Sequence, residues 1–206
     1  MQKIRSGVTA RSALEFVKLT EFIELKAAIT DCNVAYGFSA RDSFNRHARL
    51  SLQQATQQIK VENNLRTAAI FGPEATGLRK EHLDLCTQLV RIPSSTNFES
   101  FNLAQSTLLF MYELIRTQND VLQESSGDDT ATVNATINDL LQIEKLVDES
   151  ARLSGFYGKG TPSHIPSVIH NLIKRTMPTE NEASVLLGLF SKIRKALLGE
   201  IPINNE

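Results

Sequence analysis

The sequence has few cysteines, no long apolar run and no strong excess of one charge, and each absence excludes a class of protein. Its two cysteines, Cys32 and Cys86, are too few for a disulfide framework or a zinc-binding set, and they fit a reducing cytosol best. No run of about 18 apolar residues is present, so the sequence predicts no membrane-spanning helix. Residues 1–14 carry basic side chains but lack the apolar segment of a secretory signal. We therefore expect a cytoplasmic protein.

The composition is that of a folded globular chain. Its 206 residues are 41% apolar and 22% charged, which suits one ordinary domain, with or without a helical extension. The net charge of -1 hides an uneven distribution. Residues 1–60 carry nine Lys and Arg against five Asp and Glu, whereas residues 97–150 carry two against ten. A basic N-terminal region can attract a phosphate backbone, although an ordinary solvated surface explains the same pattern more simply.

Short apolar runs closed by glycine or proline predict the strands of a sheet. Three buried strands are expected at residues 33–37, 66–71 and 88–92, and a further short strand near residues 16–19. Helices are expected between and after them, at residues 20–29 with Thr20 as the cap, 43–60, 80–86 and 102–116. Because strands alternate with helices, the sequence predicts an α/β fold with a largely parallel sheet.

The remainder of the chain has a different pattern. A polar, acidic stretch at residues 123–132 lacks periodicity and is typical of a linker. Three amphipathic helix patterns follow it, at residues 134–153, 163–175 and 180–198. We therefore expect three parts: a domain over residues 1–118, a linker over 119–133 and a helical extension over 134–206.

Three loops, each directly after a predicted strand, are candidates for one binding pocket. They cover residues 37–41, 71–78 and 92–105. In an open α/β sheet, ligands bind outside the carboxyl ends of the strands, and glycines let the backbone approach a ligand closely. Backbone amides and carbonyls can then bind an adenine or a ribose. Glycine after a strand is also common in turns, so the spacing alone does not establish a site.

The wording of these loops is more specific than their spacing. FGPEATGL, then LDLC, then IPSSTNFESFNLAQS and a helix containing YEL closely resemble the SpoU/TrmH branch of the SPOUT RNA methyltransferases. The resemblance begins near Ser6, includes GFSAR at residues 37–41 and ends near Leu114. The extension, with Gly155 and a final helix rich in glutamate around Glu182, is similar to that of TrmJ-like tRNA ribose methyltransferases. The resemblance implies a deep trefoil knot, one of the rare exceptions to unknotted folds, and a homodimer in which the helix from Asn102 lies at the interface.

The resemblance also implies a cofactor, a substrate and a set of site residues. S-adenosyl-L-methionine would bind between the loops and methylate a ribose 2′-hydroxyl of tRNA, in the anticodon loop, with no metal. The implied cofactor-binding residues are Phe38, Ser39, Ala40, Gly72, Ile92, Glu99, Ser100 and Phe101. The implied catalytic residues are Ser100, Asn102 and Arg41, with Arg41 able to meet a phosphate. Glu74 matches an acidic loop residue, for which acceptance of loop amides is the simpler role.

Independent chemical signals in the sequence are weak. The four histidines have no metal-ligand spacing such as H-E-x-x-H, and no G-x-S-x-G segment supports a serine hydrolase. A 2′-hydroxyl is a poor nucleophile, so the reaction needs removal of its proton and close positioning of the reacting atoms.

The family's usual beginning, a strand and an N-x-G-x-x-x-R segment with the principal catalytic arginine, has no match in this sequence. Two explanations are open. The sequence is a fragment of an active enzyme, or it is a catalytically incomplete module that binds cofactor or RNA or mediates dimerisation. In either case we expect exposed strand edges and low stability without a partner.

Overall fold

A four-stranded parallel sheet forms the centre of the first part of the chain. The computed structural model describes residues 18, 20–40, 49–61, 65–94, 101–119, 133–158 and 160–202. The strands are β1 (Val34–Phe38), β2 (Leu50–Ser51), β3 (Thr67–Ile70) and β4 (Gln88–Arg91), in the order β2-β4-β1-β3. Every neighbouring pair is parallel, so the carboxyl ends of all four strands meet at one edge. The predicted α/β class with a parallel sheet is confirmed.

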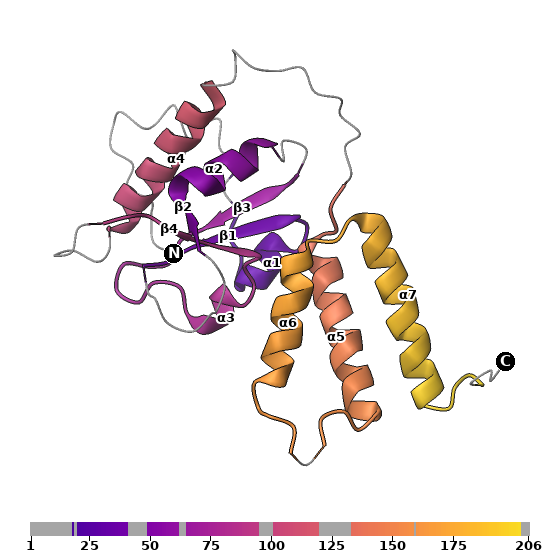
Figure 1. Ribbon diagram of the computed structural model, residues 1–206. Coiled ribbons are helices and arrows are strands. Elements are labelled where there is room, and N and C mark those ends of the chain that lie inside the picture. The colour runs from indigo at the N-terminus through magenta and orange to yellow at the C-terminus, as the bar shows by residue number, and fades with distance from the viewer. Residues whose placement is uncertain are drawn as a thin grey trace.

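Helices cover both faces of the sheet, because β1 is apolar on both sides. Val34, Tyr36 and Phe38 pack against α2 (Leu52–Val61) and α4 (Leu103–Asn119). Ala35 faces the other side, where α1 (Leu25–Ile29) and α3 (Lys80–Leu83) lie. All five residues of β1 are buried, as expected of a central parallel strand. Figure 1 shows the sheet between these two helical layers.

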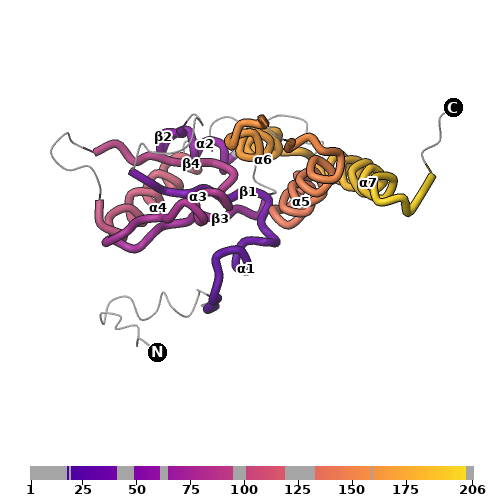
Figure 2. Tube along the Cα trace, turned by 90° about the horizontal axis from the view of Figure 1, so that it is seen from below, coloured from indigo at the N-terminus to yellow at the C-terminus, as the bar shows by residue number. Residues whose placement is uncertain are grey.

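Three further helices form a bundle beside the sheet (Figures 1 and 2). They are α5 (Ile137–Leu153), α6 (Ile165–Thr176) and α7 (Glu180–Leu197). Capping boxes fix the starts of α5 and α7. In each, the threonine hydroxyl (Thr136 or Thr179) accepts a hydrogen bond from the backbone amide three residues later (Asp139 or Glu182). The carboxylate of that later residue accepts a hydrogen bond from the backbone amide of the threonine. An ion pair between Arg194 and Glu149 at 2.6 Å joins α7 to α5.

The bundle is attached at the amino ends of the strands. The Ile137 amide donates to the carbonyl of Cys32, just before β1, and the Asn33 side chain donates to the carbonyl of Asn134. Ile137 also packs into the core on one face of the sheet. The edge formed by the carboxyl ends of the strands therefore stays clear of the bundle. No described helix is long and apolar enough to cross a membrane.

Two predicted helices begin later than the sequence suggested. The first starts at Leu25 with Glu24 at the cap position, so the predicted cap Thr20 is wrong. Of the predicted helix 43–60, residues 43–48 lie outside the described residues, Leu50 and Ser51 form strand β2, and the helix α2 begins at Leu52. A strand of two residues is too short to interrupt a helical hydrophobic pattern, which is why the sequence did not reveal it. The predicted helix 80–86 is shorter, ending at Leu83.

Several predictions fall on residues outside the described part of the chain. The strand expected at 16–19 lies there apart from Lys18, as does most of the expected linker, residues 120–132. The knot depends on the path of residues 95–100, which also lie outside the described ranges, so the knot stays a prediction.

Candidate functional site

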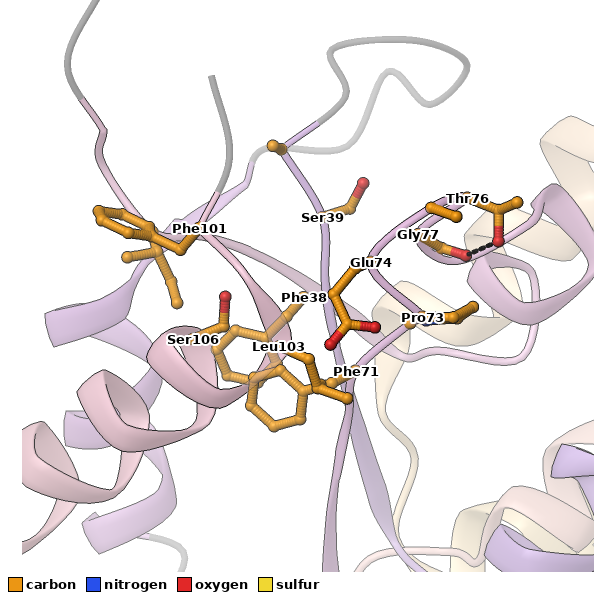
Figure 3. A pocket seen from close by; sticks show the side chains of 14 residues that line it. Phe38, Ser39, Phe71, Pro73, Glu74, Thr76, Gly77, Phe101, Leu103 and Ser106 are labelled. Carbon is orange, nitrogen blue, oxygen red and sulfur yellow. Dashed lines mark hydrogen bonds between the residues drawn. The ribbon is translucent and has the colours of Figure 1, made fainter. Parts of the chain in front are cut away.

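A pocket of about 320 Å³ lies at the carboxyl ends of β1, β3 and β4. Its walls come from the segments that follow these three strands and from the first turns of α4 (Figure 3). The lining residues are Phe38, Ser39, Ala40, Phe71, Gly72, Pro73, Glu74, Ala75, Thr76, Gly77, Ile92, Phe101, Leu103 and Ser106. The three loops that the sequence singled out do converge on one pocket.

Six of the eight predicted cofactor-binding residues line this pocket. They are Phe38, Ser39, Ala40, Gly72, Ile92 and Phe101. The other two, Glu99 and Ser100, lie outside the described residues, as does Arg41. Two of the three predicted catalytic residues, Ser100 and Arg41, are therefore not placed.

Asn102, the third predicted catalytic residue, stands at the beginning of α4 and does not line the pocket. Its Oδ1 accepts the amide of Gln105 at 2.8 Å, and its own amide donates to the Gln105 side chain at 3.3 Å. This reciprocal pair is a capping arrangement that satisfies free amides at the helix start. The side chain of Asn102 therefore orders the start of α4, whose residues Leu103 and Ser106 line the pocket.

Phe38 and Phe71 form the apolar inner wall, and Phe110 packs against both of them. Phe38 and Phe71 stack with their centroids 4.3 Å apart, and Phe110 from α4 meets Phe38 edge-on at 5.1 Å. Phe38 ends β1 and is 8% exposed, so most of its ring is used in packing and only its rim reaches the pocket. The wall is apolar at the point where a flat heterocycle can be buried.

The loop after β3 is tightly closed, which explains its two glycines. A Cβ on Gly72 would lie 2.3 Å from the carbonyl carbon of Gly77 and 2.4 Å from the amide nitrogen of Leu78. Gly77 has a φ of +60°, a conformation that glycine adopts most easily. The Gly77 amide donates to the Pro73 carbonyl at 2.7 Å, and Leu78 is buried in the core. The motif therefore specifies a compact backbone turn beside the pocket.

Glu74 contributes the negative charge of the pocket. The simpler role expected for it, acceptance of loop amides, is not seen among the described residues. The residue is exposed, and Figure 3 shows its carboxylate directed across the pocket toward Phe38 and Leu103. A carboxylate in this position favours a ligand that carries positive charge nearby.

The sequence did not identify the other lining residues. Leu103 and Ser106 are three residues apart and therefore lie on one face of α4. Pro73, Ala75 and Thr76 lie inside the FGPEATGL motif. The spacing of Leu103 and Ser106, and the position of the other three residues inside the motif, are the signals that could have identified these lining residues.

The pocket combines a small apolar wall, a backbone loop and one carboxylate. Its volume is at the lower end of the range for small-molecule and cofactor sites, about 300–1,000 Å³. Apolar walls suit an adenine ring, and the backbone of the loop and of Ile92 offers amides and carbonyls to its edge. The residues present therefore fit an adenosyl ligand with a cationic group.

Comparisons with known proteins support the sequence resemblance. The family model described as SpoU rRNA Methylase family matches residues 4–112. A tRNA (cytidine/uridine-2′-O-)-methyltransferase TrmJ of Pectobacterium atrosepticum is 24% identical over 172 residues, which are 83% of this chain and 71% of that protein. A tRNA (cytidine/uridine/adenosine-2′-O-)-methyltransferase TrmJ of Pseudomonas aeruginosa is 28% identical over 184 residues, 85% of this chain and 72% of that protein.

The fold agrees with a solved structure as well. TrmJ from Z. mobilis ZM4 superposes with a TM-score of 0.68 at 21% identity, covering 84% of this chain and 73% of that one. The matched family segment contains all four strands, the three pocket loops and most of α4. With the pocket formed where that family's motifs meet, the chain belongs to the SpoU rRNA Methylase family.

Proposed function

We propose that this chain is an S-adenosyl-L-methionine-dependent methyltransferase that acts on a ribose 2′-hydroxyl of tRNA. The observation that carries the proposal is the pocket at the carboxyl ends of β1, β3 and β4, formed by family motifs. The TrmJ relatives, which match more than four fifths of the chain, are tRNA methyltransferases named for cytidine and uridine. This supports tRNA as the substrate and cytidine or uridine as the nucleotide that is methylated. The anticodon loop is part of the proposal and rests on the sequence resemblance.

The described residues have separate roles in this proposal. Phe38 and Leu103 provide apolar contact for the adenosyl group, and the backbone of Gly72 and Ile92 meets its polar edge. Glu74 supplies the charge that complements a cationic group. S-adenosyl-L-methionine, when bound, supplies a methyl group activated by its positively charged sulfur.

The chain must also prepare the acceptor hydroxyl. For the 2′-oxygen to accept a methyl group, its hydroxyl proton would have to pass to a base or to water. Asn102 is a positioning residue here, because its side chain caps α4. Ser100, near the reaction centre, and Arg41, against an RNA phosphate, remain the residues proposed for the acceptor side.

We further propose that the protein is a homodimer through α4. Leu108, Met111, Tyr112 and Ile115 are 55–68% exposed, and their spacing of three or four residues gathers them on one side of the helix. A continuous apolar face on a helix beside the active pocket is typical of a protein–protein interface. We place the reaction in the cytoplasm, where the proposed tRNA substrate occurs.

Calorimetry with S-adenosylhomocysteine tests the cofactor proposal. The wild-type chain should bind it, and Leu103→Arg, which places a charged side chain in the pocket, should weaken binding at least tenfold. Leu197→Arg on α7 is the matched control, because Leu197 and Leu103 are similarly exposed, at 39% and 36%. A folded wild-type chain that does not bind the ligand would contradict the proposal.

Mass spectrometry of tRNA digests after incubation tests the reaction. New 2′-O-methylated cytidine or uridine in the anticodon loop is the expected product. Binding of S-adenosylhomocysteine without any methylated nucleoside would instead favour the alternative function, a module that binds cofactor without catalysis.

A further inference from the structure

A second cavity, of about 550 Å³, lies at the amino ends of the strands. Thr87 and Gln88 at the start of β4 and Leu50 at the start of β2 form one wall, and α6 forms the other. None of its lining residues lines the cofactor pocket. The cavity therefore lies at the opposite edge of the sheet, where the helical bundle meets it (Figure 1).

One side chain in its wall is unusual. Lys174 on α6 is 5% exposed, and its ammonium has no hydrogen-bond partner among the described residues. Burial lowers the pKa of Lys174 below its ordinary value, because a buried charge loses its hydration. An unpaired buried ammonium is costly, so its presence calls for a compensating anion.

Two carboxylates act electrostatically on Lys174, and each of them also lies beside another basic side chain. Asp84 pairs with Lys80 at 2.5 Å, and Glu144 on α5 pairs with His170 at 2.9 Å. Both carboxylates act on Lys174 through space, and neither forms a hydrogen bond with it. The Cys86 thiol, which also lies close, has its pKa raised to about 12 by burial and stays protonated. Within the described part of the chain, Lys174 therefore has no hydrogen-bonded anion, although Oε1 of Glu144, whose charge acts on it, also lacks a hydrogen-bond partner.

We propose that this cavity binds the phosphate group of a small molecule. Lys174 and Arg175 both line it, and two basic groups match a phosphate dianion better than a carboxylate. The Asp84 carboxylate in the same wall is paired with Lys80. Rotation about the four-carbon stem of Lys174 brings its ammonium onto a ligand in the cavity. The side-chain amide of Asn171, also in the wall, adds a nitrogen donor. The position between a helix and the sheet, rather than on an open basic face, favours a small molecule over a nucleic-acid strand.

Thermal unfolding at rising ligand concentration tests this site, because a ligand that binds only the folded chain raises Tm. Inorganic phosphate should raise Tm more than chloride at the same ionic strength. Uridine 5′-monophosphate and uridine are tested as two further ligands. Uridine should give no shift. A larger shift with the monophosphate than with phosphate identifies a nucleotide as the source, and equal shifts identify free phosphate.

Variants separate this site from other anion effects. Lys174→Met should abolish the phosphate-specific shift, and Arg175→Gln should weaken binding at least tenfold. Lys195→Met, an exposed lysine on α7, should leave the shift unchanged. Either of two results would overturn the proposal: a wild-type chain that does not distinguish phosphate from chloride, or a phosphate shift that survives in Lys174→Met. Activity toward tRNA plays no part in this readout, so the cofactor proposal can fail independently.

Discussion

The ring of Phe38 at the end of β1 stacks on the ring of Phe71, which follows β3, with the ring planes 14° apart. Because β1 and β3 are hydrogen-bonded neighbours, the stacked pair closes the carboxyl edge of the sheet at the point where the cofactor pocket opens. Phe110 covers the pair from α4. One aromatic cluster thus joins the sheet, α4 and the inner wall of the pocket.

Phe38→Ala should destabilise the protein by about 3–5 kcal/mol, because it leaves a cavity and removes two aromatic contacts. Urea unfolding followed by circular dichroism measures the loss. Phe22→Ala is the matched control, since Phe22 is 49% exposed, and it should change stability by about 0.5 kcal/mol or less. Equal effects of the two substitutions would show that the cluster contributes little.

Gly72→Ala should weaken binding of S-adenosylhomocysteine at least tenfold. The added methyl group would meet the backbone of Gly77 and Leu78, so the loop must open and lose its shape beside the pocket. Gly188→Ala on α7 should instead stabilise the protein by about 0.5–1 kcal/mol, because its Cβ meets nothing within 4 Å and alanine favours a helix. Calorimetry and thermal unfolding measure the two effects, and unchanged binding by Gly72→Ala would contradict this account of the loop.

The sequence predicted strand positions better than helix starts. The runs that became β1, β3 and β4 are rich in apolar residues and lie next to glycine or proline, so local chemistry marks their positions. The predicted burial is confirmed for β1 but is wrong for β3, which is an edge strand with only Ile70 buried. The start of α1 at Leu25 has no such signal, because Glu24 at the cap position makes no side-chain capping hydrogen bond. The two residues of β2 owe their strand conformation to pairing with Val90 and Arg91, a contact distant in sequence.

The pocket was predictable because its motifs are contiguous. Gly72 and Ile92 belong to loops whose order and sequence identify the family. Both loops follow strands of a parallel sheet, so they were expected to meet at one edge of it. The capping role of Asn102 was not foreseen, although Asn102 and Gln105 have the spacing of a capping box. The cavity beside Lys174 was invisible in the sequence, because it depends on how α6 lies against the ends of β2 and β4.

Cys86 should resist a disulfide-type thiol reagent until the protein unfolds. It is 5% exposed and lies against Gly37, and burial raises its pKa to about 12, so the reactive thiolate is scarce at neutral pH. In a Cys32→Ser variant, labelling of the native chain should be on the order of a thousandfold slower than in denaturant. Rapid labelling of the native variant would show that the space between β1 and β4 opens readily.

A double substitution on the exposed face of α4 should dissociate the proposed dimer. Leu108→Glu with Tyr112→Glu places two negative charges on that face, and facing copies would then repel each other. Light scattering after size exclusion should give the mass of a monomer for this variant and of a dimer for the wild type. Leu189→Glu is the control, since Leu189 is 50% exposed on α7, and it should leave the dimer intact. A wild-type monomer would contradict the interface.

Lys174→Met should raise stability in buffer free of phosphate, on the order of 1–2 kcal/mol at neutral pH, because it removes an unpaired buried charge. Since the pKa of Lys174 is lowered in the folded chain from 10.5, the unfolded chain binds more protons at pH values between the two pKa values. The free energy of unfolding of the wild type should therefore rise with pH between these two pKa values. Below both of them, the full destabilisation by the buried charge is present. Lys174→Met should lack this rise, whereas Lys195→Met should keep it. Denaturant unfolding at a series of pH values compares the three, and a wild-type curve parallel to that of Lys174→Met would show that the buried ammonium is compensated within the fold.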